Sequence, residues 1–205
     1  MLDNEVDEKY AREIIDEIEQ INKPNMPFDY ALANIYQKMI LKFGMPSCIT
    51  PAENGTKVVF FIGPTGVGKT TTAINLSACL AEAGCKVLVI DADPQGNTTS
   101  GLGVDKNRLN HTIYEMMIGE CDITDCVIRD VFDNLDIVPS NINLSGAEIE
   151  LIGIDRKEYI LKNASASLKE EYEYILIDCP PSLNMLTVNA LTAADAVLVK
   201  IQCEF

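Results

Sequence analysis

The stretch that most constrains the fold of this chain is residues 57–72, KVVFFIGPTGVGKTTT. Its apolar start, residues 58–62, is rich in β-branched and aromatic residues and is typical of a buried parallel strand. Residues 63–70 match the phosphate-binding pattern GxxxxGK[ST] in full, and the apolar periodicity of residues 73–83 predicts a helix after the loop. An ordinary glycine turn is the alternative, but strand, glycine loop and helix in this order favour a P-loop. We therefore expect the chain to bind a nucleotide.

The residue types of this loop explain how it would hold phosphates. Glycines let successive backbone N–H groups turn toward phosphate oxygens, and the helix N-terminus adds the positive end of its dipole. Lys69 is expected to reach the β- and γ-phosphates, and the Thr70 hydroxyl to bind Mg²⁺. We expect the Lys69 side chain to be solvated when no phosphate is bound. The predicted nucleotide-binding residues are Gly63, Pro64, Thr65, Gly66, Val67, Gly68, Lys69, Thr70 and Thr71.

The chain that precedes the loop predicts a helical appendage. Isoleucines recur at helical spacing within residues 14–21, prolines interrupt the pattern at residues 23–27, and a second apolar stripe covers residues 28–43. We expect a helical appendage over residues 1–44, a linker over 45–56 and a P-loop NTPase domain over 57–205. The appendage could dock a partner, or it could simply pack on the nucleotide-binding domain.

The rest of the chain alternates between apolar strands and helices. Strands are expected at residues 86–90, 135–138, 174–177 and 196–201; helices at 112–118, 122–129, 145–152, 156–169 and 183–193; and a loop at 98–110. Near-continuous apolar strands separated by helices imply an α/β fold with a mostly parallel sheet flanked by helices. Ligands of such sheets bind at the carboxyl ends of the strands, which is where the P-loop falls.

Two carboxylates follow strands and are candidates for the chemistry. Asp178 ends the strand YILID, where an acid can hold the Mg²⁺ shell through water; the alternative is that it caps the next helix. Asp93 lies past the second strand and is placed to orient or activate the water that attacks the γ-phosphate, unless it only forms the turn before Pro94. The predicted catalytic residues are thus Asp93 and Lys69, and the predicted metal ligands are Thr70 and Asp178.

Charge and cysteine content exclude several other classes. A formal net charge of −15 argues against a large nucleic-acid footprint, although a small basic patch is compatible with it. Seven cysteines, an odd number without a CxxC pair, indicate reduced thiols in a cytoplasmic protein. The sequence has no apolar run long enough to span a membrane. The one histidine, His111, stands before an expected helix start, which fits a capping or surface role better than catalysis.

Three segments carry a resemblance to a known family. KVLVIDADPQGNTTSGLG, PSNINLSGAEIEL and YILIDCPPSLNMLTVNALTAADAVLVKIQCEF closely resemble the ParA/Soj partitioning ATPases, over residues 71–205. The resemblance implies a SIMIBI-like P-loop fold, Mg²⁺ with ATP, and ATP-dependent dimerisation with slow hydrolysis. It also implies Asp93 as the catalytic carboxylate, Asp178 at Mg²⁺, DNA binding by the ATP-bound dimer and stimulation by a ParB-like partner.

The chain also departs from this family. The position of the family's signature lysine, which crosses the dimer to the partner's phosphates, is Pro64, and Lys200 stands where a proline is usual. The family continues past residue 205, so we expect the domain to be C-terminally incomplete. The loop GPTGVGKTTT and the acidic helices before it resemble the SRP-type GTPases FlhF and FtsY, but their guanine-reading motif is absent. Three interpretations stay open: a ParA-like ATPase, an SRP-type GTPase that uses GTP, and an inactive nucleotide-binding chimera.

Overall fold

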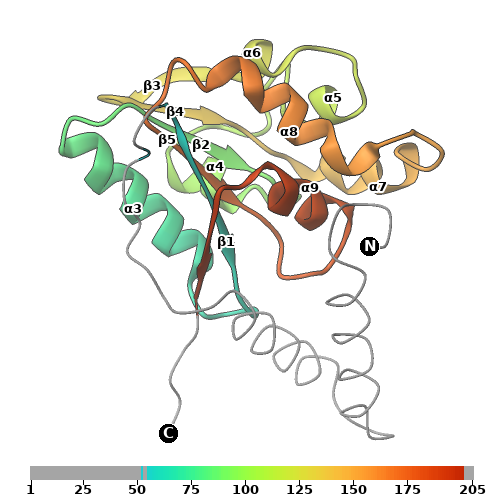
Figure 1. The fold of residues 1–205 in the computed structure, drawn as a ribbon, viewed down its shortest axis with the longest axis horizontal. Helices are drawn as coiled ribbons and strands as arrows, with labels where there is room; N and C mark the ends of the chain where they lie inside the picture. Colours follow the sequence, from blue (N-terminus) through green and yellow to red (C-terminus); the bar gives the residue numbers. More distant parts are fainter. Residues whose placement is uncertain (1–51, 53–54, 201–205) are drawn as a thin grey trace, which may run out of the picture. The chain divides into compact units, whose positions relative to one another are not determined.

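A six-stranded sheet organises the part of the chain that the structure, a computed structural model, describes: residue 52 and residues 55–200 (Figure 1). The helices expected over residues 1–44 lie outside the described residues, which belong to one compact unit. The strands, in the spatial order β3-β4-β2-β5-β1-β6, are β3 (Ile128–Phe132), β4 (Leu135–Val138), β2 (Val87–Asp91), β5 (Tyr174–Asp178), β1 (Lys57–Ile62) and β6 (Ala196–Val199). Only the pairing of β3 with β4 is antiparallel, so the predicted α/β fold with a mostly parallel sheet is confirmed.

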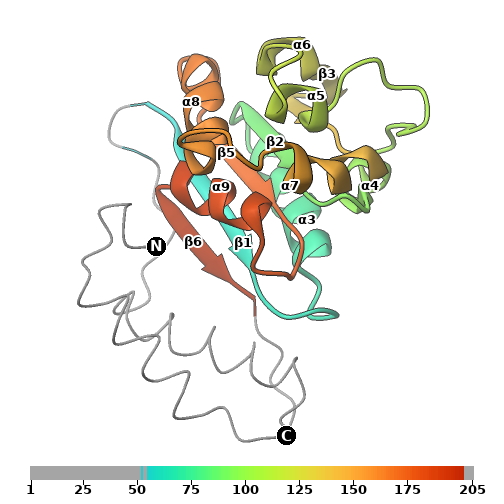
Figure 2. The same ribbon diagram turned by 90° about the vertical axis from the view of Figure 1, so that its right-hand side faces the viewer.

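The central strands are apolar on both faces because helices cover both faces. Alternate residues, among them Val59, Phe61, Val87 and Val89, form a core with Ala73 of α3 (Lys69–Glu82). The intervening residues point to the opposite face, where α8 (Ile160–Ser165) and α9 (Met185–Ala193) lie (Figures 1 and 2). The smaller helices are α4 (Asn97–Gly101), α5 (Ile113–Met117), α6 (Ile123–Cys126) and α7 (Ala147–Glu150), with 3₁₀ turns η1 (Ile142–Gly146), η2 (Lys157–Tyr159) and η3 (Ala166–Leu168).

Strand register fixes the edge of the sheet at which the candidate functional residues lie. In the pairing of β2 with β5, Asp91 lies opposite Asp178, and in that of β1 with β5, Phe61 lies opposite Asp178. The carboxyl ends of β1, β2 and β5 therefore end at one level of the sheet. The glycine loop, the loop that contains Asp93 and the carboxylate of Asp178 all begin at that edge.

Several predicted boundaries were wrong. Residues 98–110 were expected to be a loop, but α4 starts at Asn97. The helix expected over 122–129 stops at Cys126, and β3 follows it as an edge strand joined to β4 by a tight turn in which Asn134 has a φ of 61°. The helix expected over 156–169 is broken into η2, α8 and η3. These elements are short, so one or two local contacts decide them, which hydrophobic periodicity does not report.

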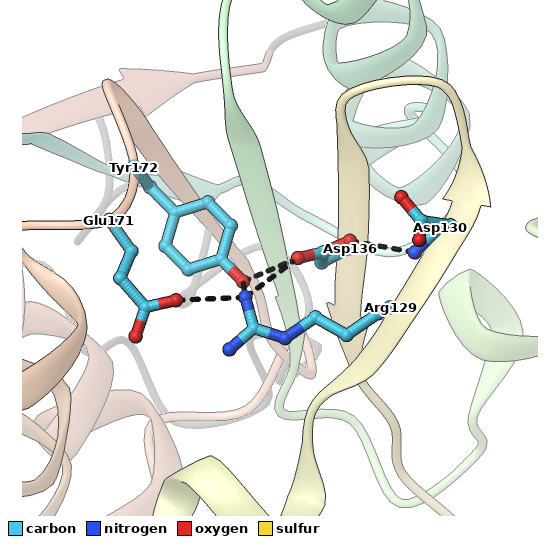
Figure 3. Close-up of polar contacts among 5 residues, drawn as sticks. All are labelled: Arg129, Asp130, Asp136, Glu171 and Tyr172. Carbon is cyan, nitrogen blue, oxygen red and sulfur yellow. Dashed lines mark hydrogen bonds and ion pairs between the residues drawn. The ribbon is translucent and has the colours of Figure 1, made fainter.

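A polar network holds the edge hairpin against the loop before β5 (Figure 3). The Asp136 carboxylate on β4 accepts hydrogen bonds from the Tyr172 hydroxyl at 2.6 Å, Arg129 Nη1 at 3.1 Å and the Asp130 backbone N–H at 2.8 Å. Arg129 also pairs with Glu171 at 2.9 Å. Because Asp136 and Tyr172 are buried, these bonds satisfy polar groups that would otherwise be costly to bury.

We predict that Asp136→Ala lowers the free energy of unfolding by about 2–3 kcal/mol, because the buried Tyr172 hydroxyl then lacks its acceptor. Urea unfolding followed by circular dichroism measures the change. Asp155→Ala, at an exposed position, is the matched control and should change stability by less than about 0.5 kcal/mol. Equal stability of the two variants would show that the network does not stabilise the hairpin.

Candidate nucleotide-binding site

The glycine loop runs from the end of β1 to the start of α3, as predicted. Gly66 and Gly68 both have a φ of 84°, and Gly68 is the N-cap residue of α3. This left-handed conformation is costly for other residues, and it turns the chain so that the backbone at the start of α3 faces the loop. Thr65 and Gly66 are exposed at its tip, and Thr71 is exposed on α3.

The Lys69 side chain was expected to be solvated, and this was wrong. Lys69 is 8% exposed, and its Nζ donates a hydrogen bond of 2.9 Å to the carbonyl oxygen of Gly63 at the start of the loop. Burial lowers the pKa of Lys69, while nearby Cys179, Asp178 and Asp93 act in the opposite direction. The loop thus folds over its own lysine and holds a poorly solvated ammonium group beside carboxylates.

The start of the loop is packed against the chain that follows β6. The Lys200 backbone N–H donates a 2.8 Å hydrogen bond to the Ile62 carbonyl, and a Cβ at Gly63 would lie 2.3 Å from the Lys200 carbonyl oxygen. Gly63 is therefore required by this close approach. A proline at position 200 could not donate the bond, so Lys200 gives the loop a backbone contact that proline would remove.

Asp178 ends β5, and its side chain is 1% exposed. Its Oδ2 accepts a 2.7 Å hydrogen bond from the Thr98 hydroxyl, whereas Oδ1 has no partner of ordinary geometry among the described residues. Burial raises the pKa of Asp178, and Thr98, Thr70 and Lys69 each oppose that rise. A buried carboxylate beside a threonine hydroxyl is the oxygen donor set that Mg²⁺ prefers. The residues present therefore fit a magnesium ion held with a nucleotide.

Asp93 lies in the loop after β2 and is half-buried. Its Oδ1 accepts a 2.9 Å hydrogen bond from the Gln95 N–H, so the turn that we considered as an alternative does form. Asp93 also acts electrostatically on both Lys69 and Asp178. Asp93 therefore lies within electrostatic range of Lys69 and Asp178.

Asp91 was missed by the sequence analysis. It ends β2 opposite Asp178, is fully buried, and accepts hydrogen bonds from the Thr99 N–H at 2.8 Å and the Thr99 hydroxyl at 2.7 Å. Burial raises the pKa of Asp91 to about 7, with a smaller contribution from Asp178, against the effect of the Thr99 bonds. The available signal was that Asp91 closes one apolar strand as Asp178 closes another.

Thr98 and Thr99 were not among the predicted site residues, because the sequence predicts a loop where α4 forms. Thr99 Oγ1 accepts a 2.9 Å bond from the Ser140 N–H after β4, so α4 links the ends of β2, β4 and β5. Within residue 52 and residues 55–200, no group of three or more His, Cys, Asp or Glu side chains could hold a metal ion by itself. Magnesium in nucleotide sites takes few protein ligands, so this finding agrees with the fit of Thr70 and Asp178.

Comparison with known proteins agrees with this geometry. A family model described as an AAA domain, AAA_31, matches residues 56–205. The sporulation initiation inhibitor protein Soj of Bacillus subtilis is 50% identical over 140 residues, which cover 68% of this chain and 55% of that protein. The chromosome partitioning protein ParA of Caulobacter vibrioides is 51% identical over 142 residues, 68% of this chain and 53% of that protein.

A solved structure is similar over much the same part. The cobyrinic acid a,c-diamide synthase of Mycobacterium smegmatis, with a bound ATP analogue and magnesium, has a TM-score of 0.70 and 41% identity, covering 73% of this chain and 62% of that one. The chain spans about half the length of the curated relatives that it matches. The family match begins at residue 56, so it includes β1 and the glycine loop. The predicted resemblance of this loop to SRP-type GTPases has no support in these comparisons, since none of the three proteins is such a GTPase. No helix in the described ranges is long and apolar enough to cross a membrane.

We predict that Asp91 makes the stability of the ligand-free protein depend on pH. Between its ordinary pKa of 3.8 and about 7, the folded state holds a proton that the unfolded state has lost, so the free energy of unfolding falls as the pH rises. Asp91→Asn cannot titrate and should show a shallower fall across this window. Urea unfolding at a series of pH values measures both slopes, with Asp155→Asn as the control. Identical slopes for Asp91→Asn and the wild type would contradict the raised pKa.

Proposed function

Because the chain belongs to the AAA_31 family of AAA-domain proteins, we propose that it is a Mg²⁺-dependent ATPase of the ParA/Soj kind. It would hydrolyse the β–γ phosphate bond of ATP as a switch in chromosome or plasmid partitioning. The observation that carries this proposal is that Lys69, Asp93 and Asp178 lie within electrostatic range of one another, near the ends of β1, β2 and β5. The names of the relatives, which include partitioning proteins, and the ATP analogue and magnesium of the similar structure support the process and the ligand.

Binding would use groups that the loop already holds in place. The Lys69 ammonium donates to a single carbonyl, that of Gly63, so phosphate oxygens would give this buried charge a stronger partner. The N–H groups at the start of α3 would contact the same phosphates. Thr70 and Asp178 would hold the magnesium ion, whose charge neutralises the phosphate oxygens when it is bound.

Turnover would depend on the carboxylate of Asp93. Phosphoryl transfer needs an oriented nucleophile and neutralised charge more than covalent catalysis. Asp93 is half-buried, while Asp178 and Asp91 are fully buried and engaged with Thr98 and Thr99. Of the three carboxylates, Asp93 is therefore the one that a water molecule can reach, and we assign it the role of positioning and activating that water.

We propose the partners of the chain from the family alone. They are a second copy of the chain in the ATP-bound state and a ParB-like activator, in the cytoplasm. With Pro64 in place of the signature lysine, the dimer would form without a lysine donated across it. The net charge of −15 argues against DNA as a major ligand of this chain.

A second candidate is a GTPase of the SRP type, related to FlhF and FtsY, with its N-terminal segment and loop drawn from that class. The loop sequence GPTGVGKTTT, with Pro64 and Thr65 where the ParA family has lysine and glycine, favours it. Residues 91–97, DADPQGN, and residues 177–181, IDCPP, stand where such GTPases carry motifs of their own, so we rank this candidate second.

We expect Asp93→Asn to bind ATP with magnesium as the wild type does and to lose turnover by about 100-fold or more, because the attacking water is no longer activated. Phosphate release measures turnover, and calorimetry measures binding. Asp105→Asn, at an exposed position beyond α4, is the control and should keep full turnover. Turnover that survives in Asp93→Asn would place the catalytic carboxylate elsewhere, and a wild type without turnover would favour an inactive chimera.

The nucleotide preference separates the two candidates. Calorimetric titration of the wild type with ATP and with GTP, each with magnesium, is expected to show tighter binding of ATP. Tighter binding of GTP would move the assignment to the SRP-type GTPase.

A further inference from the structure

A groove lies between two parts of the helical layer, away from the glycine loop. Its volume is about 730 Å³, and its lining comes from α5, α6 and α8 with the turn between α5 and α6. Met116 and Ile160 give it apolar walls, and Cys121 lines it from the turn. Nothing in the proposed ATPase mechanism uses this groove.

Cys121 faces a second cysteine. Its Sγ lies 3.4 Å from the Sγ of Cys126, the last residue of α6. Cys126 is 1% exposed, and its thiol donates to the carbonyl oxygen of Thr112 at 3.1 Å. Cys121 is half-buried and open to the groove. One thiol is therefore accessible, and the other is buried directly behind it.

The short helix α6 sets this arrangement. The Asp122 backbone N–H donates a 3.3 Å hydrogen bond to the Asp125 carboxylate, and the Asp125 N–H donates a 3.0 Å bond to the Asp122 carbonyl, so the first turn is held at both residues. This turn brings the residue before the N-cap next to the last residue of the helix. The local backbone structure thus holds the two cysteines together. Only a small movement of the chain would bring their sulfur atoms to the length of a disulfide bond.

We propose that Cys121 and Cys126 form a dithiol modification site, at which a small disulfide that enters the groove produces an intrachain disulfide. The Cys121 thiolate attacks one sulfur of the small disulfide, whose S–S bond breaks and releases one thiol. The Cys126 sulfur then attacks Cys121 in the mixed disulfide, and a second small thiol leaves. The two protein thiols lose two electrons and two protons, and the small disulfide gains them as two thiols.

The surroundings set the rate and the consequence of this reaction. Burial raises the pKa of both thiols, and the carboxylates of Asp125 and Glu115 add to the rise, so the exchange is slow at neutral pH. Formation of the disulfide removes the hydrogen bond that the Cys126 thiol donates to the Thr112 carbonyl oxygen. Thr112 is the N-cap residue of α5, so the disulfide exchanges a contact of this cap for a covalent link across α6.

The experiment uses the full chain incubated with oxidised glutathione at about pH 9, where the thiolate fraction of each cysteine is larger than at neutral pH. Free thiols are then alkylated, and the chain is digested with trypsin without reduction. The mass of the peptide of residues 109–129, which contains both cysteines, is measured by mass spectrometry. The expected peptide is two hydrogen atoms lighter than the dithiol and carries neither an alkyl group nor glutathione. A peptide alkylated at both cysteines, or one that keeps glutathione on Cys121, would overturn the proposal.

Two variants test the order of the steps. Cys126→Ser should stop at the mixed disulfide, with glutathione on Cys121, because the second sulfur is absent. Cys79→Ser, at an exposed cysteine of α3, is the control and should close the Cys121–Cys126 disulfide as the wild type does. A Cys126→Ser variant without glutathione on Cys121 would show that Cys121 is not the entry thiol.

Discussion

The candidate site depends on the hydrogen bond between the buried ammonium group of Lys69 and the Gly63 carbonyl oxygen. A charge with 8% exposure is unfavourable unless it is paired, and in this chain one backbone carbonyl holds it, with the carboxylates of Asp178 and Asp93 nearby. The backbone of the loop surrounds this group. Glycines in the left-handed conformation make the turn of the loop, and the close approach of Lys200 fixes the start of the loop at Gly63.

Two neighbouring strands of the sheet end in buried acids at the same edge. Asp91 and Asp178 share a register position on β2 and β5, so two buried acids lie on neighbouring strands. They differ in the hydrogen bonds that they accept. Asp91 takes three hydrogen bonds from the chain around it and links to Thr99, whereas Asp178 keeps one oxygen without a partner among the described residues. Asp91 thereby links the end of β2 to α4, and we propose Asp178 as the acid that holds a ligand.

The sequence predicted where the candidate site residues lie along the chain, and their roles stay predictions. The glycine pattern located the loop of residues 63–70, the end of the strand YILID located Asp178, and the segment after the second strand located Asp93. Burial could not be predicted in the same way: Lys69 was expected in solvent, because its contact with Gly63 arises only when the loop closes. Strand β3 and helix α4 were missed because each has five residues and is decided by a tight turn or by a side chain such as Thr99. The register that sets Asp91 beside Asp178 is a tertiary property.

The most direct test of this account is calorimetric binding of ATP with magnesium to the wild type and to Lys69→Ala, with circular dichroism of both. The account predicts that the wild type binds and that the variant keeps its fold and loses binding, since the buried cation is the main partner of the phosphates. A folded Lys69→Ala variant that binds ATP as tightly as the wild type would contradict the central claim that the glycine loop and its lysine form the nucleotide site.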